Sequence, residues 1–311
     1  MDVVQKAKDI VSLMKLTLDI WLRSQSFIFA GALAFFTLFS IAPVVILAVH
    51  ILGLVLSTDA AMAQIMAQLE NAVGAEAAEA VAVAVESSRL SQGSIVGTVI
   101  GLGALAFGAT TVFAQMQRAL NTVWQVVAKP TRNSIMLMVR SRLLSLTVVL
   151  SIGFVLLVSM LLSVLIRAVM VFAQEWIPLP PMGVYLIEFS VSIFVVSLLF
   201  ATIFKVLPDV NLSWRHVWPG AVLTALLFIL GRSLIAMYLA KTATASAYGA
   251  AGSLVMLLLW VNYSSLILLF GAAFTRAYTE HKGIEIEPKP TALRQQLVLV
   301  DENNEAVKIH A

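Results

Sequence analysis

The chain has 311 residues, of which 60% are hydrophobic and 12% are charged, with a formal net charge of +3. This leaves too little polar surface to cover a water-soluble globule of that size, so the composition excludes an ordinary soluble domain and indicates a membrane protein. The sequence contains no Cys, which excludes disulfides, thiolate nucleophiles and cysteine-based metal sites.

Residues 1–26 are predicted to form a helix that lies on the cytoplasmic surface of the membrane. Charged residues occupy one part of the helix surface, a pattern typical of interfacial helices. The same charges argue against a cleaved signal peptide, so the first span is expected to direct insertion. The apolar residues recur at helical spacing: Val3, Ala7, Ile10, Met14, Leu18 and Trp21.

Six apolar blocks follow, each long enough to cross a hydrocarbon core of about 30 Å, for which about 20 helical residues suffice. We therefore expect an all-α, polytopic membrane protein with one six-helix domain over 27–279. A loosely ordered cytoplasmic tail is expected over 280–311, with a short hairpin across 297–309 as an option. The predicted spans cover residues 27–56, 94–116, 143–172, 183–206, 218–240 and 253–275.

Local signals refine three of these segments. Pro43 removes a backbone donor in the middle of the first span and predicts a kink there. The insert over 57–93 predicts two short external amphipathic helices, the first with a cap signal at Thr58 and Asp59. Pro219 is expected in the first turn of the fifth span, where proline is tolerated.

The basic residues predict the orientation of the spans. Sixteen of the 20 Lys and Arg fall in the N-terminal 26 residues, in 118–142, in 205–216 and from 276 onward, which are alternate gaps between the apolar blocks. Loops that carry Lys and Arg stay on the cytoplasmic side of the membrane. Both termini are therefore predicted to be cytoplasmic.

Ionisable side chains within the spans are costly in lipid and mark candidate functional positions. At the helical rise, Arg167, Glu188 and Arg232 lie about 8–12 Å inward from the predicted external ends, and His50 lies at a similar depth. The functional interpretation is a polar cavity in which Arg167 and Arg232 receive an anionic group beside Glu188. The structural alternative is an ion pair, with Arg167 and Glu188 snorkelling to nearby headgroups.

Uncharged polar residues lie near the midplane of the sixth span. Asn262 and Tyr263, with Ser264 and Ser265 beside them, offer hydrogen-bond donors and acceptors there. They could line a path for a substrate. They could equally bond one helix to another, as such residues usually do.

Motifs of enzymes are absent from the sequence. The four His are scattered without metal-ligand spacing, and no hydrolase elbow, zinc pair or P-loop occurs. We therefore expect a protein that is not an enzyme, with no catalytic residue, metal or cofactor. The basic stretch over 132–142 lacks aromatic residues for base stacking, so we expect membrane lipids as partners and no nucleic acid.

Four motifs occur in order along the chain: ALAFFTLFSIAP, QRALNTVW, LPDVNLSWRHVWPGA, and YGAAGSLVMLLLW leading into LLFGAAFTRAY. Together they resemble the YihY/BrkB family of bacterial inner-membrane proteins, over residues 15–282. The resemblance implies six spans with both ends cytoplasmic. The family once carried the label ribonuclease BN, and its BrkB-like members are linked with serum resistance and export of small amphiphiles. Its pattern singles out Pro43, Asn121, Trp124, Pro208, Gly220, Tyr248, Gly249, Trp260 and Gly271.

One departure from the family pattern bears on mechanism. Many relatives read Gly-Ala-Glu where this chain has Gly271, Ala272 and Ala273, which argues against a role for an intramembrane carboxylate there. The sequence favours a transporter, exporter or flippase of a lipidic or amphiphilic anionic substrate in the bacterial inner membrane. The alternative is a non-transporting membrane organiser or scaffold. Ribonuclease activity is disfavoured because no cytoplasmic acid and base are placed to attack a phosphodiester.

Overall fold

The structure, a computed structural model, describes residues 3–53, 57–73, 78–79, 81–83, 85–86, 111–129, 181–241 and 252–296. The second and third predicted spans fall almost wholly outside these ranges, and so does the hairpin predicted across 297–309. Arg167, Tyr248 and Gly249 also lie outside the described residues.

The described part of the chain is mostly helical. Residues 111–123 form a helical segment that leads into the first of two short strands. The other elements, in chain order, are α1 (Val3–Arg23), α2 (Ser26–Leu52), α3 (Thr58–Val73), β1 (Val126–Ala128), α7 (Pro181–Val206), α8 (Trp214–Lys241), α10 (Gly252–His281) and β2 (Ala292–Arg294).

Three of the described helices, α7, α8 and α10, are long and apolar enough to cross a membrane. α1 and α2 together form a fourth candidate span, broken by a bend of 58°. These helices correspond to four of the predicted spans: α2 to 27–56, α7 to 183–206, α8 to 218–240 and α10 to 253–275. The helical class is confirmed with three to four candidate spans, and the full set of six stays a prediction.

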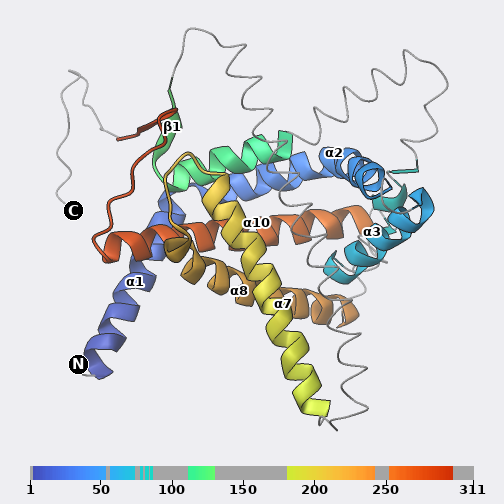
Figure 1. Cartoon of the computed structure of the whole chain (residues 1–311), viewed down its shortest axis with the longest axis horizontal. Helices are drawn as coiled ribbons and strands as arrows, with labels where there is room; N and C mark the ends of the chain where they lie inside the picture. Colours follow the sequence, from blue (N-terminus) through green and yellow to red (C-terminus); the bar gives the residue numbers. More distant parts are fainter. Residues whose placement is uncertain are drawn as a thin grey trace.

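α2 and α10 run along the long axis of the molecule, and α7 crosses them steeply (Figure 1). α10 packs against both α2 and α8, and α7 packs on α8 while leaning away from the others (Figure 1). The end of α7, the start of α8 and the end of α10 gather at one end of the molecule, beside the strands (Figure 1). The end of α2 lies at the opposite end with α3. Because α8 starts and α10 ends beside the strands, these two helices run in opposite directions.

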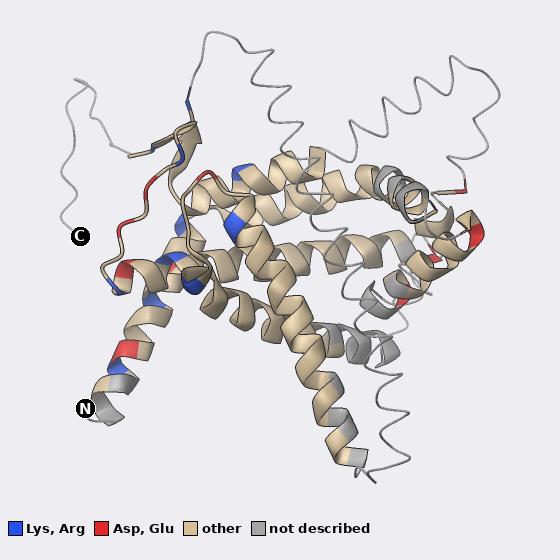
Figure 2. Ribbon diagram, in the orientation of Figure 1, with Lys and Arg blue, Asp and Glu red and all other residues tan. Residues whose placement is uncertain are grey.

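Charged residues distinguish the two ends of the molecule. The Lys and Arg drawn in Figure 2 gather at the end that carries the strands, which we call the basic end. The opposite end, which we call the acidic end, carries Asp59 and Glu70 on α3 (Figure 2). This division matches the one that the loop charges predict. The orientation of the molecule in a membrane stays a prediction.

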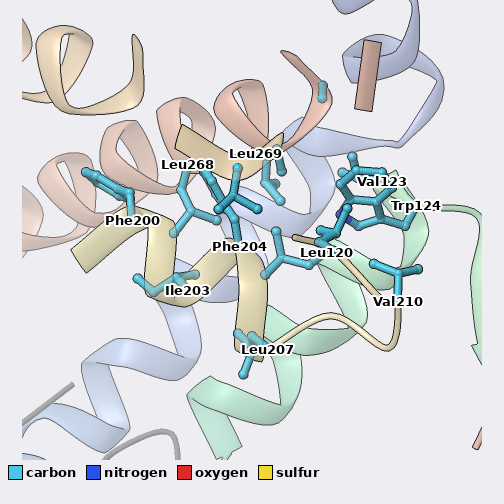
Figure 3. Close-up of a cluster of buried hydrophobic side chains, with 14 of the residues drawn as sticks. Leu120, Val123, Trp124, Phe200, Ile203, Phe204, Leu207, Val210, Leu268 and Leu269 are labelled. Atoms are coloured by element: carbon cyan, nitrogen blue, oxygen red, sulfur yellow. The ribbon is translucent and has the colours of Figure 1, made fainter. Parts of the chain in front are cut away.

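Each end has its own apolar core. At the basic end, side chains from the 111–123 segment, α7 and α10 interdigitate around Leu120, Phe204 and Leu269 (Figure 3). At the acidic end, Val45 and Val49 of α2 pack with residues of α3 and with Leu257 of α10. α10 therefore contributes to both cores.

The helix predicted over 1–26 is present as α1. Its bend to α2 is built from local bonds: Gln25 has a φ of 54°, and the buried Ser26 hydroxyl donates to the Trp21 carbonyl at 2.7 Å. The Trp21 indole in turn donates to the Leu266 carbonyl of α10 at 3.2 Å. α1 also exposes an apolar strip that contains Leu18 and Leu22, next to its charged side. Its position on a membrane surface stays a prediction.

One helix start and one helix cap differ from the predictions. α8 begins at Trp214, so Pro219 lies within the helix and not in its first turn, and that prediction is wrong. Ser213, a residue type favoured at the N-cap, directly precedes the helix and lies six residues before the proline. α3 begins at Thr58 as expected, but the capping oxygen belongs to Ser57, which accepts from the Ala60 amide at 3.3 Å.

The prediction of a loosely ordered tail from residue 280 is wrong for residues 282–296. β2 pairs antiparallel with β1, with Val127 opposite Leu293. The Asn211 amide donates to the Glu287 carbonyl, and the Lys289 amide donates to the Asp209 carbonyl, both at 2.9 Å. Backbone bonds to distant segments therefore hold this part of the chain, although its composition is polar.

α2 runs without interruption through Pro43. The predicted kink at that residue stays a prediction.

Candidate functional site

Three of the four ionisable residues of the predicted cavity lie on helices that the structure describes. His50 lies near the end of α2, Glu188 lies in the first half of α7, and Arg232 lies in the second half of α8. All three positions belong to the halves of their helices away from the basic end. Their side chains and Arg167 lie outside what the structure describes, so the cluster of charges stays a prediction.

Among the polar residues of α10, Tyr263 contacts α8 at Gly231. A methyl group on Gly231 would lie 1.9 Å from the Tyr263 hydroxyl, so the tyrosine ring rests directly on the glycine backbone. The same hydroxyl is 3.5 Å from the Leu227 carbonyl. Tyr263 therefore acts as an interhelical contact, one of the two predicted alternatives. Asn262 beside it is half-buried, and Arg232 directly follows Gly231.

A hydrogen-bonded cluster at the basic end, which we call the polar junction, comprises Gln117, Asn121, Asp209 and Lys289. The Asn121 side chain donates to the Asp209 carboxylate at 2.8 Å and accepts from the Asp209 amide at 2.8 Å. Gln117 donates to both oxygens of the same carboxylate at 3.3 Å. Residues of QRALNTVW and LPDVN, far apart in sequence, are joined here.

Lys289 completes the polar junction from the segment after α10. Its ammonium donates to the Val206 carbonyl at 3.1 Å and to the Pro208 carbonyl at 2.7 Å, where α7 has unsatisfied carbonyl groups. Burial lowers the pKa of Lys289, the charge of Asp209 opposes that shift, and Lys205 adds to it. The lysine thus connects the end of α7 to the following loop.

Arg276 joins α10 to the segment before β1. Its guanidinium donates to the Val123 carbonyl at 2.7 Å, to the Gln125 side chain at 3.0 Å and to Glu280 at 2.6 Å. Gln125 has a φ of 51°, and its carbonyl accepts from the Gln295 amide at 2.7 Å. Gln125, the left-handed residue that follows the 111–123 helix, is thus held by Arg276 and by the Gln295 amide.

α8 and α10 approach each other through a matched pair of Gly and Thr residues. A methyl group on Gly220 would lie 1.9 Å from Thr275 Oγ1, and one on Gly271 would lie 1.7 Å from Thr224 Oγ1. Each Thr hydroxyl donates to the glycine carbonyl one turn earlier on its own helix, at 2.6 and 2.8 Å. Only glycine leaves room for this approach.

The structure explains most of the family-pattern positions that it describes. Asn121 and Pro208 belong to the polar junction or contact it, and Gly220 and Gly271 form the helix crossing. Trp124 and Trp260 are buried, and Trp260 packs edge-on against Phe228 with ring centres 5.5 Å apart. These positions are therefore accounted for by packing and hydrogen bonding.

Several interacting residues were missed in the sequence. Thr224 and Thr275 had a readable signal, because each follows a glycine by four positions and so shares its helix face. Asp209 and Lys289 had none, since their partners lie in distant segments, and for Arg276 only the pair with Glu280, four positions later, was readable. Among the described residues, no three His, Asp or Glu side chains are placed to hold one metal ion.

The fold and these contacts define a helical membrane protein whose helices are fastened at one end by a hydrogen-bonded junction. The chain belongs to the virulence factor BrkB family, whose model matches residues 18–296. No solved structure matches this chain.

Curated relatives carry names that describe little beyond the membrane. The UPF0761 membrane protein of Idiomarina loihiensis is 29% identical over 62% of this chain and 65% of its own length. That of Mannheimia succiniciproducens is 26% identical over 79% and 82%. A ribonuclease-like protein of Bacillus subtilis, YfkH, is 26% identical over 60% and 67%. The chain thus spans just under two thirds of the first relative.

Proposed function

We propose that the chain is a multi-pass protein of the bacterial inner membrane that transports or flips a lipidic or amphiphilic anionic substrate, without a catalytic site of its own. The observation that carries the proposal is the contact of Tyr263 with Gly231. This contact brings the polar residues of α10 to the level of Arg232 on α8. A basic position and uncharged polar groups from two candidate spans therefore share one layer.

The cost of an arginine in lipid supports a functional role for this layer. A charged side chain within the hydrocarbon costs at least about 2.5 kcal/mol, and such residues commonly face a protein interior or a ligand. In the proposal, the Arg232 guanidinium binds the anionic headgroup, and Asn262 contributes uncharged donors beside it. Arg167, Glu188 and His50 are proposed to line the same cavity.

The fastening of the helices at the basic end favours a second candidate, a scaffold that organises other membrane components without moving a substrate. The polar junction and the Gly–Thr crossing would suit such a static body. Transport by purified protein separates the two candidates. YfkH is named ribonuclease-like, and we propose that the present chain does not cleave RNA, which incubation of purified protein with RNA would test.

Thiol labelling tests the proposed orientation. Because the chain has no Cys, single cysteines are the sole targets of a thiol reagent. In intact cells, an impermeant reagent should label Ser57→Cys and Ser94→Cys, and should leave Ser134→Cys and Ser213→Cys unlabelled until the membrane is permeabilised. Labelling of Ser213→Cys in intact cells would reverse the assignment of the basic end to the cytoplasm.

The Arg232→Ala variant tests the substrate site. In proteoliposomes, it should slow the movement of a fluorescent anionic phospholipid about ten- to hundredfold, because charged hydrogen bonds are worth about 1.5–3 kcal/mol. Arg232→Lys should recover only part of the rate, since an ammonium cannot bind a phosphate through two parallel bonds.

A matched control lies at the start of the same helix. Arg215 is exposed at the basic end, so Arg215→Ala should move lipid at the wild-type rate. Insertion, monodispersity and the melting temperature are measured for all variants, so that misfolding is recognised. Wild-type rates in the Arg232→Ala variant would rule out this site, and no movement by wild-type protein would favour the scaffold.

A further inference from the structure

A pocket of about 330 Å³ lies at the basic end, apart from the proposed substrate layer. It is lined by residues of the last turns of α10, by residues at the start of β1, and by residues 284–286 and 294–296 of the segment that follows α10. Its volume falls within the range of small-molecule sites, which begins at about 300 Å³. Trp124 and Val210 provide apolar wall, and Gln125 provides a polar group.

Four charged side chains line this pocket, two basic and two acidic: Arg276, Arg294, Glu280 and Glu285. Arg276 is 14% exposed, and three hydrogen bonds hold its guanidinium in place. Both of its terminal nitrogens carry a second N–H, since each uses one N–H in these bonds. A preorganised donor group therefore stands at the pocket wall.

Arg294 is held much more loosely. Its side chain is 55% exposed, its closest carboxylate is Glu285 at 3.8 Å, and its contact with the Ile286 carbonyl is 3.4 Å long. Glu285 is itself 83% exposed. An exposed ion pair of this length contributes little to stability, so both side chains can turn to a ligand at small cost.

The four charges sum to zero, which favours a ligand that carries both a positive and a negative group. A simple anion would meet two carboxylates, and a simple cation would meet two guanidinium groups. A ligand that carries both charges a few bonds apart can satisfy both sets together. Arginine matches the geometry of phosphate oxygens, and a carboxylate accepts from the N–H groups of a primary ammonium.

We propose that this pocket binds a zwitterionic ligand that carries a phosphodiester and a primary ammonium, the chemistry of a phosphoethanolamine headgroup. The phosphate binds Arg294 and Arg276, and the ammonium binds Glu285 and Glu280. Two sources share this chemistry, a lipid headgroup and a free soluble phosphodiester. The inference stands independently of transport and of Arg232.

The position of the pocket favours the lipid as source. The apolar window of α10 covers 28 residues, from Leu254 to His281. At the helical rise this is about 42 Å, which equals the thickness of a bilayer with its headgroup layers, about 40–45 Å. The last two turns of α10, which carry Arg276 and Glu280, therefore reach headgroup depth.

Calorimetry on purified, delipidated protein tests the chemistry. Glycerophosphoethanolamine should bind at least about tenfold more tightly than glycerol phosphate or ethanolamine, because only the first satisfies both charge sets. Glycerophosphocholine should also bind more weakly, because its quaternary ammonium has no N–H to donate. Equal affinity for glycerol phosphate and glycerophosphoethanolamine would overturn the zwitterionic ligand, and no binding of any of these probes would overturn the site.

Two exposed residues allow substitutions that leave the fold intact. Arg294→Ala should weaken glycerophosphoethanolamine binding about tenfold, and Glu285→Gln should reduce the preference over glycerol phosphate. Arg215→Ala, an exposed arginine outside the pocket, is the matched control and should bind as wild type does. Unchanged binding by Arg294→Ala would place the ligand elsewhere.

Native mass spectrometry distinguishes the two sources of the ligand. Protein released from nanodiscs that contain phosphatidylethanolamine and phosphatidylglycerol should retain the former if the ligand is a lipid, and Arg294→Ala should lose it. Soluble binding without retained lipid would assign the free phosphodiester, and retention of phosphatidylethanolamine that Arg294→Ala leaves unchanged would contradict the proposal.

Discussion

Replacement of Asn121 by Asp should destabilise the protein severely near neutral pH, and more than replacement by Ala. Asn121 is 9% exposed and both donates to and accepts from Asp209, each at 2.8 Å. Asn121→Ala leaves the carboxylate and the amide of Asp209 without these partners, which should cost about 2–4 kcal/mol. Asn121→Asp places two carboxylates at hydrogen-bonding distance, and the repulsion adds to that loss.

The pH dependence separates the two variants. Two adjacent carboxylates raise each other's affinity for a proton, so protonation of one of them restores a hydrogen bond. The folded state of Asn121→Asp then binds more protons than its unfolded state, and its stability should rise as the pH falls toward about 5. Asn121→Ala should show no such recovery relative to wild type. Thermal unfolding in detergent across this pH range measures both.

A neighbouring residue gives the control for this experiment. The Thr122 hydroxyl bonds to the Arg118 carbonyl within its own helix, so Thr122→Ala should change the melting temperature little. If Asn121→Asp melted at the wild-type temperature at pH 8, Asn121 would not hold Asp209 in the folded protein, and the polar junction would lose its proposed structural role.

The helices were predictable because their signals are local. The predicted span over 183–206 differs from α7 by two residues at its start and ends at the same residue, Val206. Apolar length and flanking charges lie within the segment itself, so one sequence suffices to find them. The prediction ended α10 six residues too early, because its last turns carry polar side chains that apolar length does not count.

The hydrogen bonds between distant segments were not predictable from local signals. Asn121 and Asp209 are 88 positions apart, and Lys289 is 81 positions from the Pro208 carbonyl that it binds. Nothing in the sequence near Lys289 indicates a partner. β1 and β2 have three residues each, too few for an alternating pattern to be recognised. The resemblance to a family pointed to Asn121 and Pro208 without giving the reason, which is the polar junction.

The predicted charge cluster illustrates a different limit. Depth along a helix follows from residue counts, so Glu188 and Arg232 could be placed in the half of each helix away from the basic end. The direction of a side chain around the helix depends on neighbours that the sequence does not identify. Tyr263 shows the consequence, because its depth along the helix did not indicate its contact with Gly231 of α8.

Replacement of Gly271 by Ala should disrupt the crossing of α8 and α10. The added methyl group would lie 1.7 Å from Thr224 Oγ1 and 3.1 Å from the Phe204 ring, and Thr224 is fully buried. Rotation of Thr224 would move its hydroxyl but not its Cβ, which would lie 3.0 Å from the added methyl group, so the buried neighbours must shift. Overpacking of this kind typically costs about 1–3 kcal/mol, and we expect a value at or above the upper figure. Thermal unfolding in detergent measures it.

Two further variants make the test of this crossing specific. Gly31 lies in α2 with nothing within 4 Å of an added methyl group, so Gly31→Ala should be neutral or stabilise by about 0.5–1 kcal/mol. Thr224→Ala removes the hydroxyl that the Gly271→Ala methyl group would strike, so the double variant Gly271→Ala/Thr224→Ala should be more stable than the sum of the two single losses. Strict additivity of the two losses would mean that the helices do not meet at these residues. A wild-type melting temperature for Gly271→Ala would contradict the close approach itself, since the added methyl group would also lie 3.0 Å from Thr224 Cβ and 3.1 Å from the Phe204 ring.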